Sequence, residues 1–128
     1  MPIVNDCILI DDDQDDQEIF LMALEKAEAQ INCFVAKDGI EGLKTLSDLS
    51  YVPRYIFVDI NMPKIDGMEC LRQIRKLDHL RNSRVVMYST SADAGIIRQC
   101  KELGADDFLA KPSGLESLVS SLSNILKR

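Results

Sequence analysis

The chain has 128 residues, of which 46% are hydrophobic and 28% are charged, values that are ordinary for a folded globular domain. Its 15 basic and 21 acidic residues give a net charge of −6, which argues against nucleic acids and anionic membranes as direct partners. The sequence contains no apolar run near the ~20 residues of a membrane-spanning helix and no signal peptide at its start. We therefore expect a single domain over residues 1–128, located in the cytoplasm.

The four cysteines are too far apart in the sequence for a C-x-x-C pair or a zinc-binding pattern. They are Cys7, Cys33, Cys70 and Cys100. We predict that all four are buried free thiols in a reducing compartment.

Short apolar runs alternate along the chain with segments whose apolar residues recur at helical spacing. Five runs favour strands, over residues 7–10, 31–36, 55–58, 84–88 and 107–110. Five segments favour helices, over residues 15–29, 40–49, 67–77, 93–103 and 115–126. Gly104 follows the fourth helix, where a left-handed cap is expected. Such an alternation predicts a parallel sheet with helices on both faces. The best-fitting architecture is the flavodoxin-like (βα)5 doubly wound fold, with five strands in the order 2-1-3-4-5.

Chemically active side chains follow four of these predicted strands. Asp11 and Asp12 follow the first strand, Asp59 the third, Ser89 the fourth and Lys111 the fifth. In an open α/β sheet the carboxyl ends of the strands meet at one edge, where ligands bind. Three carboxylates at this edge would repel one another unless a cation lies between them. Oxygen ligands in small number favour Mg²⁺, held by Asp12, Asp59 and a backbone carbonyl just beyond Asp59.

This combination of groups suits a phosphoryl group. A carboxylate such as Asp59 can act as a nucleophile and form an acyl phosphate. The Lys111 ammonium and the Ser89 hydroxyl can reach the phosphoryl oxygens and stabilise their charge.

The motifs at these positions resemble a known family. Asp11-Asp12, Asp59 with Met62-Pro63 and Asp66-Gly67, Ser89, and Lys111-Pro112 together resemble the receiver domain of two-component response regulators. The resemblance runs from about Cys7 to the C-terminus, and residues 103–108 resemble the family's approach to its last strand.

The resemblance implies a role for each matching residue at the site. Asp59 would be the phosphoacceptor, taking phosphate from a phosphohistidine of a sensor kinase or phosphotransfer protein. Asp12 would bind Mg²⁺ together with the Asn61 carbonyl, and Asp11 would support it.

A conformational switch is implied as well. Ser89 would be a hydroxyl that moves toward the phosphate, and Phe108 would be an aromatic side chain that then packs inward. Thr90 stands where a small residue is common, so access to the site is expected to differ. The Lys111–Pro112 bond would be cis.

Other polar residues have simpler structural interpretations. We expect Asp13, Asp15 and Asp16 to cap a helix or to complement its dipole, and Asp66-Gly67 to form a turn and cap. His79, the only histidine, is expected to be exposed to solvent without a functional role. The basic residues between Arg72 and Arg84 are expected to form a cationic helix C-terminus.

We therefore expect a stand-alone, chemotaxis-regulator-like receiver, because Arg128 leaves no room for an output domain. It would not be an enzyme beyond its own phosphorylation and dephosphorylation. Its signal would reach an unknown downstream protein through the fourth helix, fifth strand and fifth helix. Two alternatives are a small aspartyl-phosphate phosphatase of the haloacid-dehalogenase type and a binding module that acts without phosphorylation. The phosphatase fits less well, because its nucleophile follows the first strand and it usually carries a cap insertion.

Overall fold

The computed structural model describes residues 2–27 and 30–127. In this part of the chain five parallel strands form one sheet in the order β2-β1-β3-β4-β5, as predicted. The strands are β1 (Ile3–Ile10), β2 (Asn32–Ala36), β3 (Val52–Asp59), β4 (Arg84–Ser89) and β5 (Asp107–Ala110). The helices are α1 (Gln14–Ala27), α2 (Gly39–Asp48), α3 (Gly67–Ile74), α4 (Ala94–Glu102) and α5 (Leu115–Leu126), with a 3-10 turn, η1 (Asp78–Leu80).

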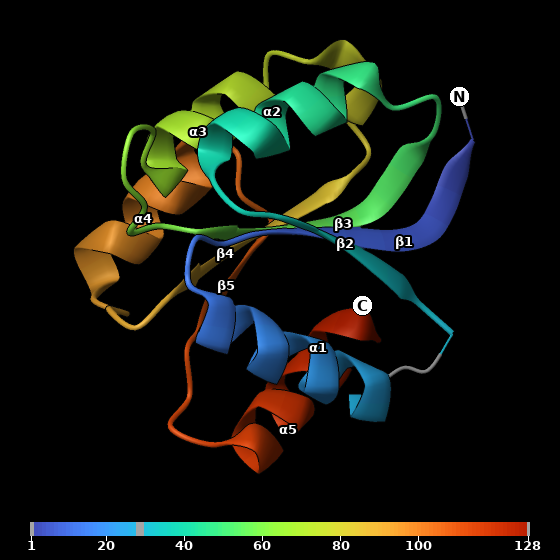
Figure 1. Cartoon of the computed structure of the whole chain (residues 1–128). Helices are drawn as coiled ribbons and strands as arrows, with labels where there is room; N and C mark the ends of the chain where they lie inside the picture. Colours follow the sequence, from blue (N-terminus) through green and yellow to red (C-terminus); the bar gives the residue numbers. More distant parts are fainter. Residues whose placement is uncertain (1, 28–29, 128) are drawn as a thin grey trace.

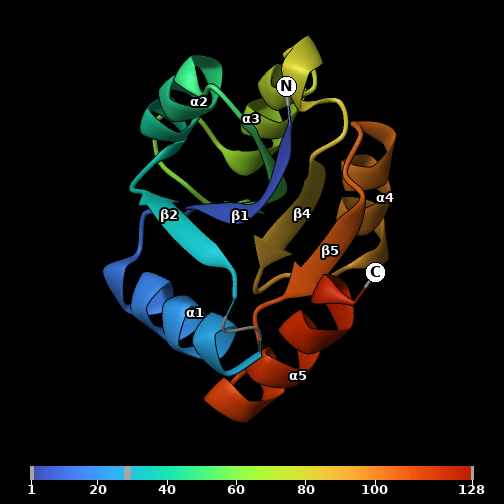
Figure 2. The ribbon, with the colours of Figure 1, turned by 90° about the vertical axis from the view of Figure 1, so that its right-hand side faces the viewer.

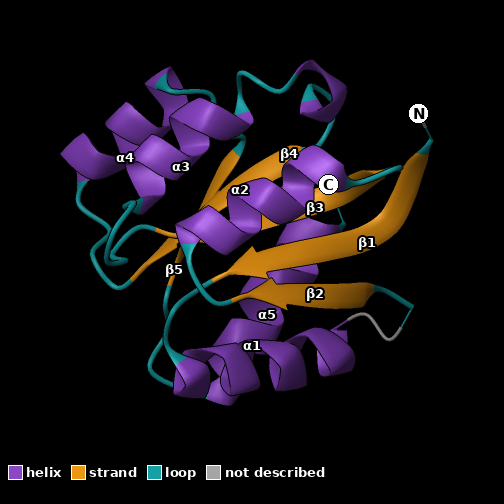
Figure 3. Ribbon diagram, turned by 45° about the horizontal axis from the view of Figure 1, so that its top comes forward, coloured by secondary structure: helices purple, strands orange, loops and turns teal. Residues whose placement is uncertain are grey.

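The helices cover both faces of the sheet. Helices α2, α3 and α4 lie on one face, and α1 and α5 lie side by side on the other (Figures 1 and 2). Figure 3 shows the strands as a layer between these two groups of helices. None of the helices in the described residues is long and apolar enough to cross a membrane. The predicted cytoplasmic location stays a prediction.

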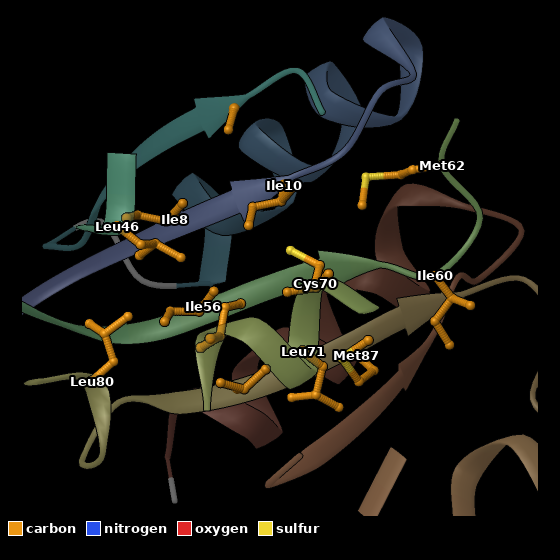
Figure 4. Close-up of a cluster of buried hydrophobic side chains, with 14 of the residues drawn as sticks. Ile8, Ile10, Leu46, Ile56, Ile60, Met62, Cys70, Leu71, Leu80 and Met87 are labelled. Atoms are coloured by element: carbon orange, nitrogen blue, oxygen red, sulfur yellow. The ribbon is translucent and has the colours of Figure 1, made fainter. Parts of the chain in front are cut away.

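Successive side chains of each strand point to opposite faces of the sheet, so the apolar residues form two separate cores. On the α2–α4 face, Ile8, Ile56 and Met87 pack with side chains of α2 and α3 such as Leu46 and Leu71 (Figure 4). On the opposite face, residues such as Leu9, Phe57 and Val86 pack with α1 and α5. The central strand β3 contributes to both cores and is buried without interruption from Tyr55 to Asp59. This explains why its sequence lacks the polar–apolar alternation of a strand with one wet face.

The strands of the sheet are longer than their most apolar segments. β1 and β3 begin at Ile3 and Val52, before the predicted starts, and their pairing shifts register between Val4 and Cys7. In β1 these first residues are polar or partly exposed, and in β3 the buried Val52 and Pro53 are separated from the apolar run by the exposed Arg54, so the apolar pattern did not reveal them.

The third helix ends three residues before its predicted end. After Ile74, the Lys76 and Leu77 amides donate to carbonyls three residues back, which tightens the chain into a turn. The Arg75 guanidinium then donates to the carbonyls of Gly104, Leu80 and Ser83 and to the Asp106 carboxylate. Gly104 has the predicted left-handed backbone, with φ of +107°. The predicted end of the first helix, residues 28 and 29, lies outside the described residues.

Two predictions about single side chains were wrong. His79 is half-buried, and its Nε2 lies 2.9 Å from the Leu46 carbonyl oxygen, because the 3-10 turn folds it back toward α2. Cys33 is only half-buried, because it lies on the edge strand β2. The other three cysteines are buried, and all four are free thiols.

The start of α3 passes very close to the end of β3. Asp66 caps the helix by accepting a hydrogen bond from the Glu69 amide, as predicted. The Gly67 amide donates to the Ile60 carbonyl at 2.8 Å. A Cβ on Gly67 would collide with the Asp59 carbonyl oxygen and would lie 2.6 Å from Ile60 Cα. Gly67 is therefore needed because backbone occupies the space of a side chain.

We predict that Gly67→Ala lowers the free energy of unfolding by about 1–3 kcal/mol, because the backbone around Asp59 must shift to admit the methyl group. Urea unfolding of the two proteins measures the difference. Gly95→Ala is the matched control, since Gly95 is an exposed residue of helix α4, and it should stabilise by about 0.5 kcal/mol. Equal effects at the two positions would contradict the close approach.

Candidate functional site

The sheet brings the predicted site residues to one edge through hydrogen bonds that continue beyond the strands. The Asp11 amide donates to the Ala36 carbonyl, and the Ile60 amide donates to the Tyr88 carbonyl. The Lys111 amide donates to the Ser89 carbonyl at 2.8 Å. Each residue that follows a strand is thus held by the neighbouring strand. The predicted convergence of Asp11, Asp12, Asp59, Ser89 and Lys111 at this edge is confirmed.

Three carboxylates form an acidic cluster at this edge. Asp11, Asp12 and Asp59 each offer an oxygen, and these oxygens lie within 4.8 Å of one another. Asp11 and Asp59 are buried, with 0% and 4% of their surface exposed, whereas Asp12 is exposed to solvent. A cluster of hard oxygen donors with one open side fits a divalent cation that keeps some of its water.

Asp59 is the buried carboxylate at the end of β3. Its Oδ1 accepts a hydrogen bond from the Asn61 amide at 3.2 Å, and its Oδ2 lies 3.4 Å from Lys111 Nζ. Burial raises the pKa of Asp59, although the Lys111 charge and the Asn61 amide oppose this shift. The groups around Asp59 therefore compensate the negative charge of its carboxylate only in part.

Asp11 is buried more deeply than Asp59. Its Oδ1 accepts a hydrogen bond from the Asp13 amide at 2.9 Å, and its Oδ2 lies 3.4 Å from Lys111 Nζ. Burial raises the pKa of Asp11 from 3.8 to about 7, against the opposing effects of the Asp13 amide and Lys111. Burial thus favours the protonated form of this side chain.

Lys111 supplies the positive charge of the site. Its ammonium lies 4.8 Å from the centre of the Tyr88 ring and contacts three carboxylates, those of Asp11, Asp16 and Asp59. Burial alone would lower the pKa of Lys111, but the hydrogen bond to Asp16 and the nearby carboxylates outweigh burial and raise it. Lys111 is therefore firmly protonated.

Two sequence-based expectations near Lys111 were wrong. The Lys111–Pro112 bond is trans, since no described peptide bond is cis, and the lysine reaches Asp59 in that form because β4 already positions its backbone. Asp16 was expected to cap a helix or to complement its dipole, yet it makes the shortest contact to Lys111, at 2.8 Å. No local pattern distinguishes Asp16 from its neighbour Asp15, because Asp12 and Asp13 precede α1 and the contact with Lys111 joins residues far apart in the chain.

Ser89 and Thr90 lie beside the acidic cluster rather than within it, and Phe108 lies further back along β5. The Ser89 side chain is buried, and its Oγ accepts a hydrogen bond from the Ser91 amide at 3.1 Å. Thr90 lines the cleft in front of Asp59. Phe108 is half-buried on β5 and packs against the core on the α2–α4 face.

The site opens to solvent through a cleft of about 260 Å³. Its lining includes carboxylates from the start of α1, residues that follow β3 and β4, and the Lys111 ammonium. The lining residues are Asp12, Asp13, Asp16, Asp59, Asn61, Thr90 and Lys111. A small anionic group can therefore reach Asp59 and Lys111 together.

Comparisons with known proteins agree with this geometry. The family model described as the response regulator receiver domain matches residues 7–123. A transcriptional regulatory protein CpxR homolog from Haemophilus influenzae is 34% identical over 122 residues, which are 94% of this chain and 50% of that protein. The chain spans half or less of the length of the first curated relatives it matches, so its predicted stand-alone action stays a prediction.

Solved structures with the same fold include two response regulators. The phosphorylated cyanobacterial phytochrome response regulator RcpA has a TM-score of 0.84 and 26% identity, covering 96% of this chain and 91% of that one. The Mn²⁺-bound form of response regulator Rcp1 has a TM-score of 0.81 and 25% identity, covering 95% and 91%. The fold, the cluster at its carboxyl edge and the match over residues 7–123 place this chain in the response regulator receiver domain family.

Proposed function

We propose that this chain accepts a phosphoryl group on Asp59 from a phosphohistidine of a sensor kinase or phosphotransfer protein. The observation that carries the proposal is a buried carboxylate that faces an open cleft with an ammonium 3.4 Å away. The phosphorylated state described for RcpA, a relative with the same fold, supports it. Receiver domains of this type are generally not enzymes, and we propose that this chain catalyses only its own phosphorylation and dephosphorylation.

The proposed transfer is a displacement at phosphorus. An Asp59 oxygen forms a bond to phosphorus while the bond from phosphorus to the histidine nitrogen breaks, and the electron pair stays on that nitrogen. Lys111 pairs with an oxygen of the transferred group. The negative charge on Asp59 and on the transferred group then needs little further stabilisation from water. The open cleft gives the donor a direct approach.

Mg²⁺ is the cofactor that these residues suit. Asp12, Asp59 and the Asn61 carbonyl would hold the ion, with Asp11 supporting it, because the cluster offers hard oxygen donors and one open side. When bound, Mg²⁺ would neutralise negative charge on the phosphoryl oxygens. The Mn²⁺-bound form of response regulator Rcp1, which has the same fold, supports a divalent metal as the cofactor.

Phosphorylation is proposed to change which protein this chain binds. Ser89 would leave the Ser91 amide and turn toward the phosphoryl group, with Thr90 moving beside it. Phe108 would then pack more deeply, which alters the surface formed by α4, β5 and α5. The partner is a downstream protein rather than a nucleic acid or a membrane, since the chain carries a net charge of −6.

We predict that Asp59→Asn abolishes phosphate uptake and leaves the fold intact, because the amide is a poor nucleophile of nearly the same shape. Intact mass after incubation with Mg²⁺ and acetyl phosphate should show one added phosphoryl group on the wild type only. Asp78→Asn, at an exposed aspartate outside the cleft, is the control and should label normally. Labelling of the Asp59→Asn protein would refute the assignment.

We predict that stabilisation by Mg²⁺ increases between pH 6 and pH 8. The raised pKa of Asp11, about 7 against 3.8, gives the metal-free fold extra stability at low pH that is lost as the pH rises through 7. Mg²⁺ requires the ionised carboxylates, so it competes with this proton and binds more tightly above pH 7.

Thermal unfolding with Mg²⁺ and with EDTA measures this effect. A hundredfold excess of Mg²⁺ over its Kd adds about 2.7 kcal/mol to the free energy of unfolding. The difference in Tm should therefore reach several degrees at pH 8 and be smaller at pH 6. Asp11→Asn should remove most of the pH dependence, and an unchanged pH profile in this variant would assign the effect to other groups.

We predict that Ser89→Ala still takes up phosphate but no longer transmits the change to Phe108. Aromatic NMR of Phe108 before and after acetyl phosphate treatment measures the response. Ser91→Ala is the control, because it keeps the backbone amide that Ser89 contacts. An equal Phe108 response in wild type and Ser89→Ala would show that Ser89 is not the link.

A further inference from the structure

The Lys111 ammonium has an unequal set of carboxylate partners. Its Nζ lies 2.8 Å from Asp16 Oδ2 and 3.4 Å from both Asp11 Oδ2 and Asp59 Oδ2. In this arrangement the best ion pair of the lysine is with a residue outside the acidic cluster. The lysine therefore lies closer to the α1 carboxylate than to the carboxylate proposed to receive phosphate, with which it still forms an ion pair.

The geometry of Asp16 is fixed by two independent anchors. The Asp16 amide donates to the capping Asp13 side chain at 3.1 Å, and the Gln17 side chain donates to the Asp11 carbonyl at 2.6 Å. These contacts fix the start of α1 against the end of β1. The Lys111 backbone is held on the other side by Ser89. The Asp16–Lys111 contact is thus a bridge between elements that the fold already positions.

Asp16 is also the carboxylate that can most easily release the lysine. Its side chain is 36% exposed, whereas those of Asp11 and Asp59 are 0% and 5% exposed. When the ammonium leaves, water can solvate Asp16 but can scarcely reach Asp11. The ion pair between Asp16 and Lys111 can therefore break reversibly. A phosphoryl group on Asp59, which carries more negative charge, can attract the ammonium away from Asp16.

We propose that Asp16 is a positioning residue that keeps the shortest ion pair of Lys111 on itself, rather than on Asp59, until a phosphoryl group is transferred. This inference rests on the proposed function of Asp59 and assigns Asp16 a role in controlling it. By holding the ammonium, Asp16 leaves Asp59 and Asp12 more negative, which favours Mg²⁺. Because Asp16 holds the Lys111 ammonium, an anionic phosphodonor also meets less positive charge in the cleft. Asp16 thus strengthens metal binding and slows phosphorylation.

The experiment compares Asp16→Asn with Asp15→Asn and Asp16→Glu. Asp15 lies in the same first turn of α1 and has the same charge, but it is exposed and has no contact with Lys111 among the described residues. Asp15→Asn therefore reproduces the loss of one charge at the helix start without changing the lysine. Glu at position 16 keeps the charge and can still reach the ammonium, so it should behave like the wild type.

Two measurements are made on each protein. The first is Mg²⁺ affinity by isothermal titration calorimetry, which requires no phosphorylation. The second is the rate of phosphorylation by acetyl phosphate at saturating Mg²⁺, followed by intact mass. For Asp16→Asn we expect Mg²⁺ affinity to fall about threefold or more and phosphorylation to accelerate by a similar factor, because the freed ammonium moves toward Asp59. Asp15→Asn should change both by less than about twofold, since its charge is screened by solvent.

A Lys111→Met background shows whether Asp16 acts through the lysine. There, Asp16→Asn should change Mg²⁺ affinity no more than Asp15→Asn does. Equal effects of the two Asn variants in the wild-type background, or an Asp16→Asn effect that persists without Lys111, would overturn the proposal. If the wild type takes up no phosphate, the proposed function fails, while the Mg²⁺ titrations still decide the role of Asp16.

Discussion

The interaction on which the structure of the site depends is the contact of one buried ammonium with several carboxylates. Lys111 Nζ lies within 3.4 Å of Asp11 and Asp59, two acids that the fold removes from water. The negative charge of neither carboxylate is fully compensated by its neighbours, and burial raises the pKa of both. A site with this excess of negative charge favours the binding of a cation, such as a divalent metal ion. It also places the buried carboxylate of Asp59, the proposed phosphoacceptor, in the lining of an open cleft.

The remainder of the fold holds these charges at short range in spite of their repulsion. Two apolar cores, one on each face of the sheet, stabilise the strands that end at the cluster. Backbone hydrogen bonds continue past the strand ends, so that residues such as Asp11 and Lys111 are fixed by neighbouring strands. Gly67 lets α3 begin against the Asp59 carbonyl. Stability gained in the cores thus offsets an electrostatically unfavourable edge.

Two residues near this edge are the ones that we propose transmit a change of charge at Asp59. Ser89 is buried beside the cluster, and Phe108 lies half-buried on the next strand, at the border of the α2–α4 core. Arg75 binds the turn after α4 and the start of β4, which fixes the far end of this region. A change at Asp59 would therefore act on the end of β4 nearest the site, while the opposite end of the region stays anchored.

The sequence by itself determined the fold and most of the site. Strands such as residues 55–58 and helices with a regular apolar stripe carry a local signal, and their alternation permits few topologies. Because parallel strands end at a common edge, it followed that Asp11, Asp12, Asp59 and Lys111 would meet. Motif residues then indicated the family that the comparison over residues 7–123 showed.

Only the tertiary structure decided which neighbours share a charge or a contact across the fold. Asp16 and Lys111 are far apart in the chain, and nothing local distinguishes Asp16 from Asp15 until α1 is placed against β5. The Nε2 contact of His79 with the Leu46 carbonyl arises in the same way, from a turn that folds back on α2. Apolar periodicity records which side chains are buried, because burial depends on one residue at a time. The partner of an ammonium depends on where two separate elements come to rest, and a local pattern does not contain that information.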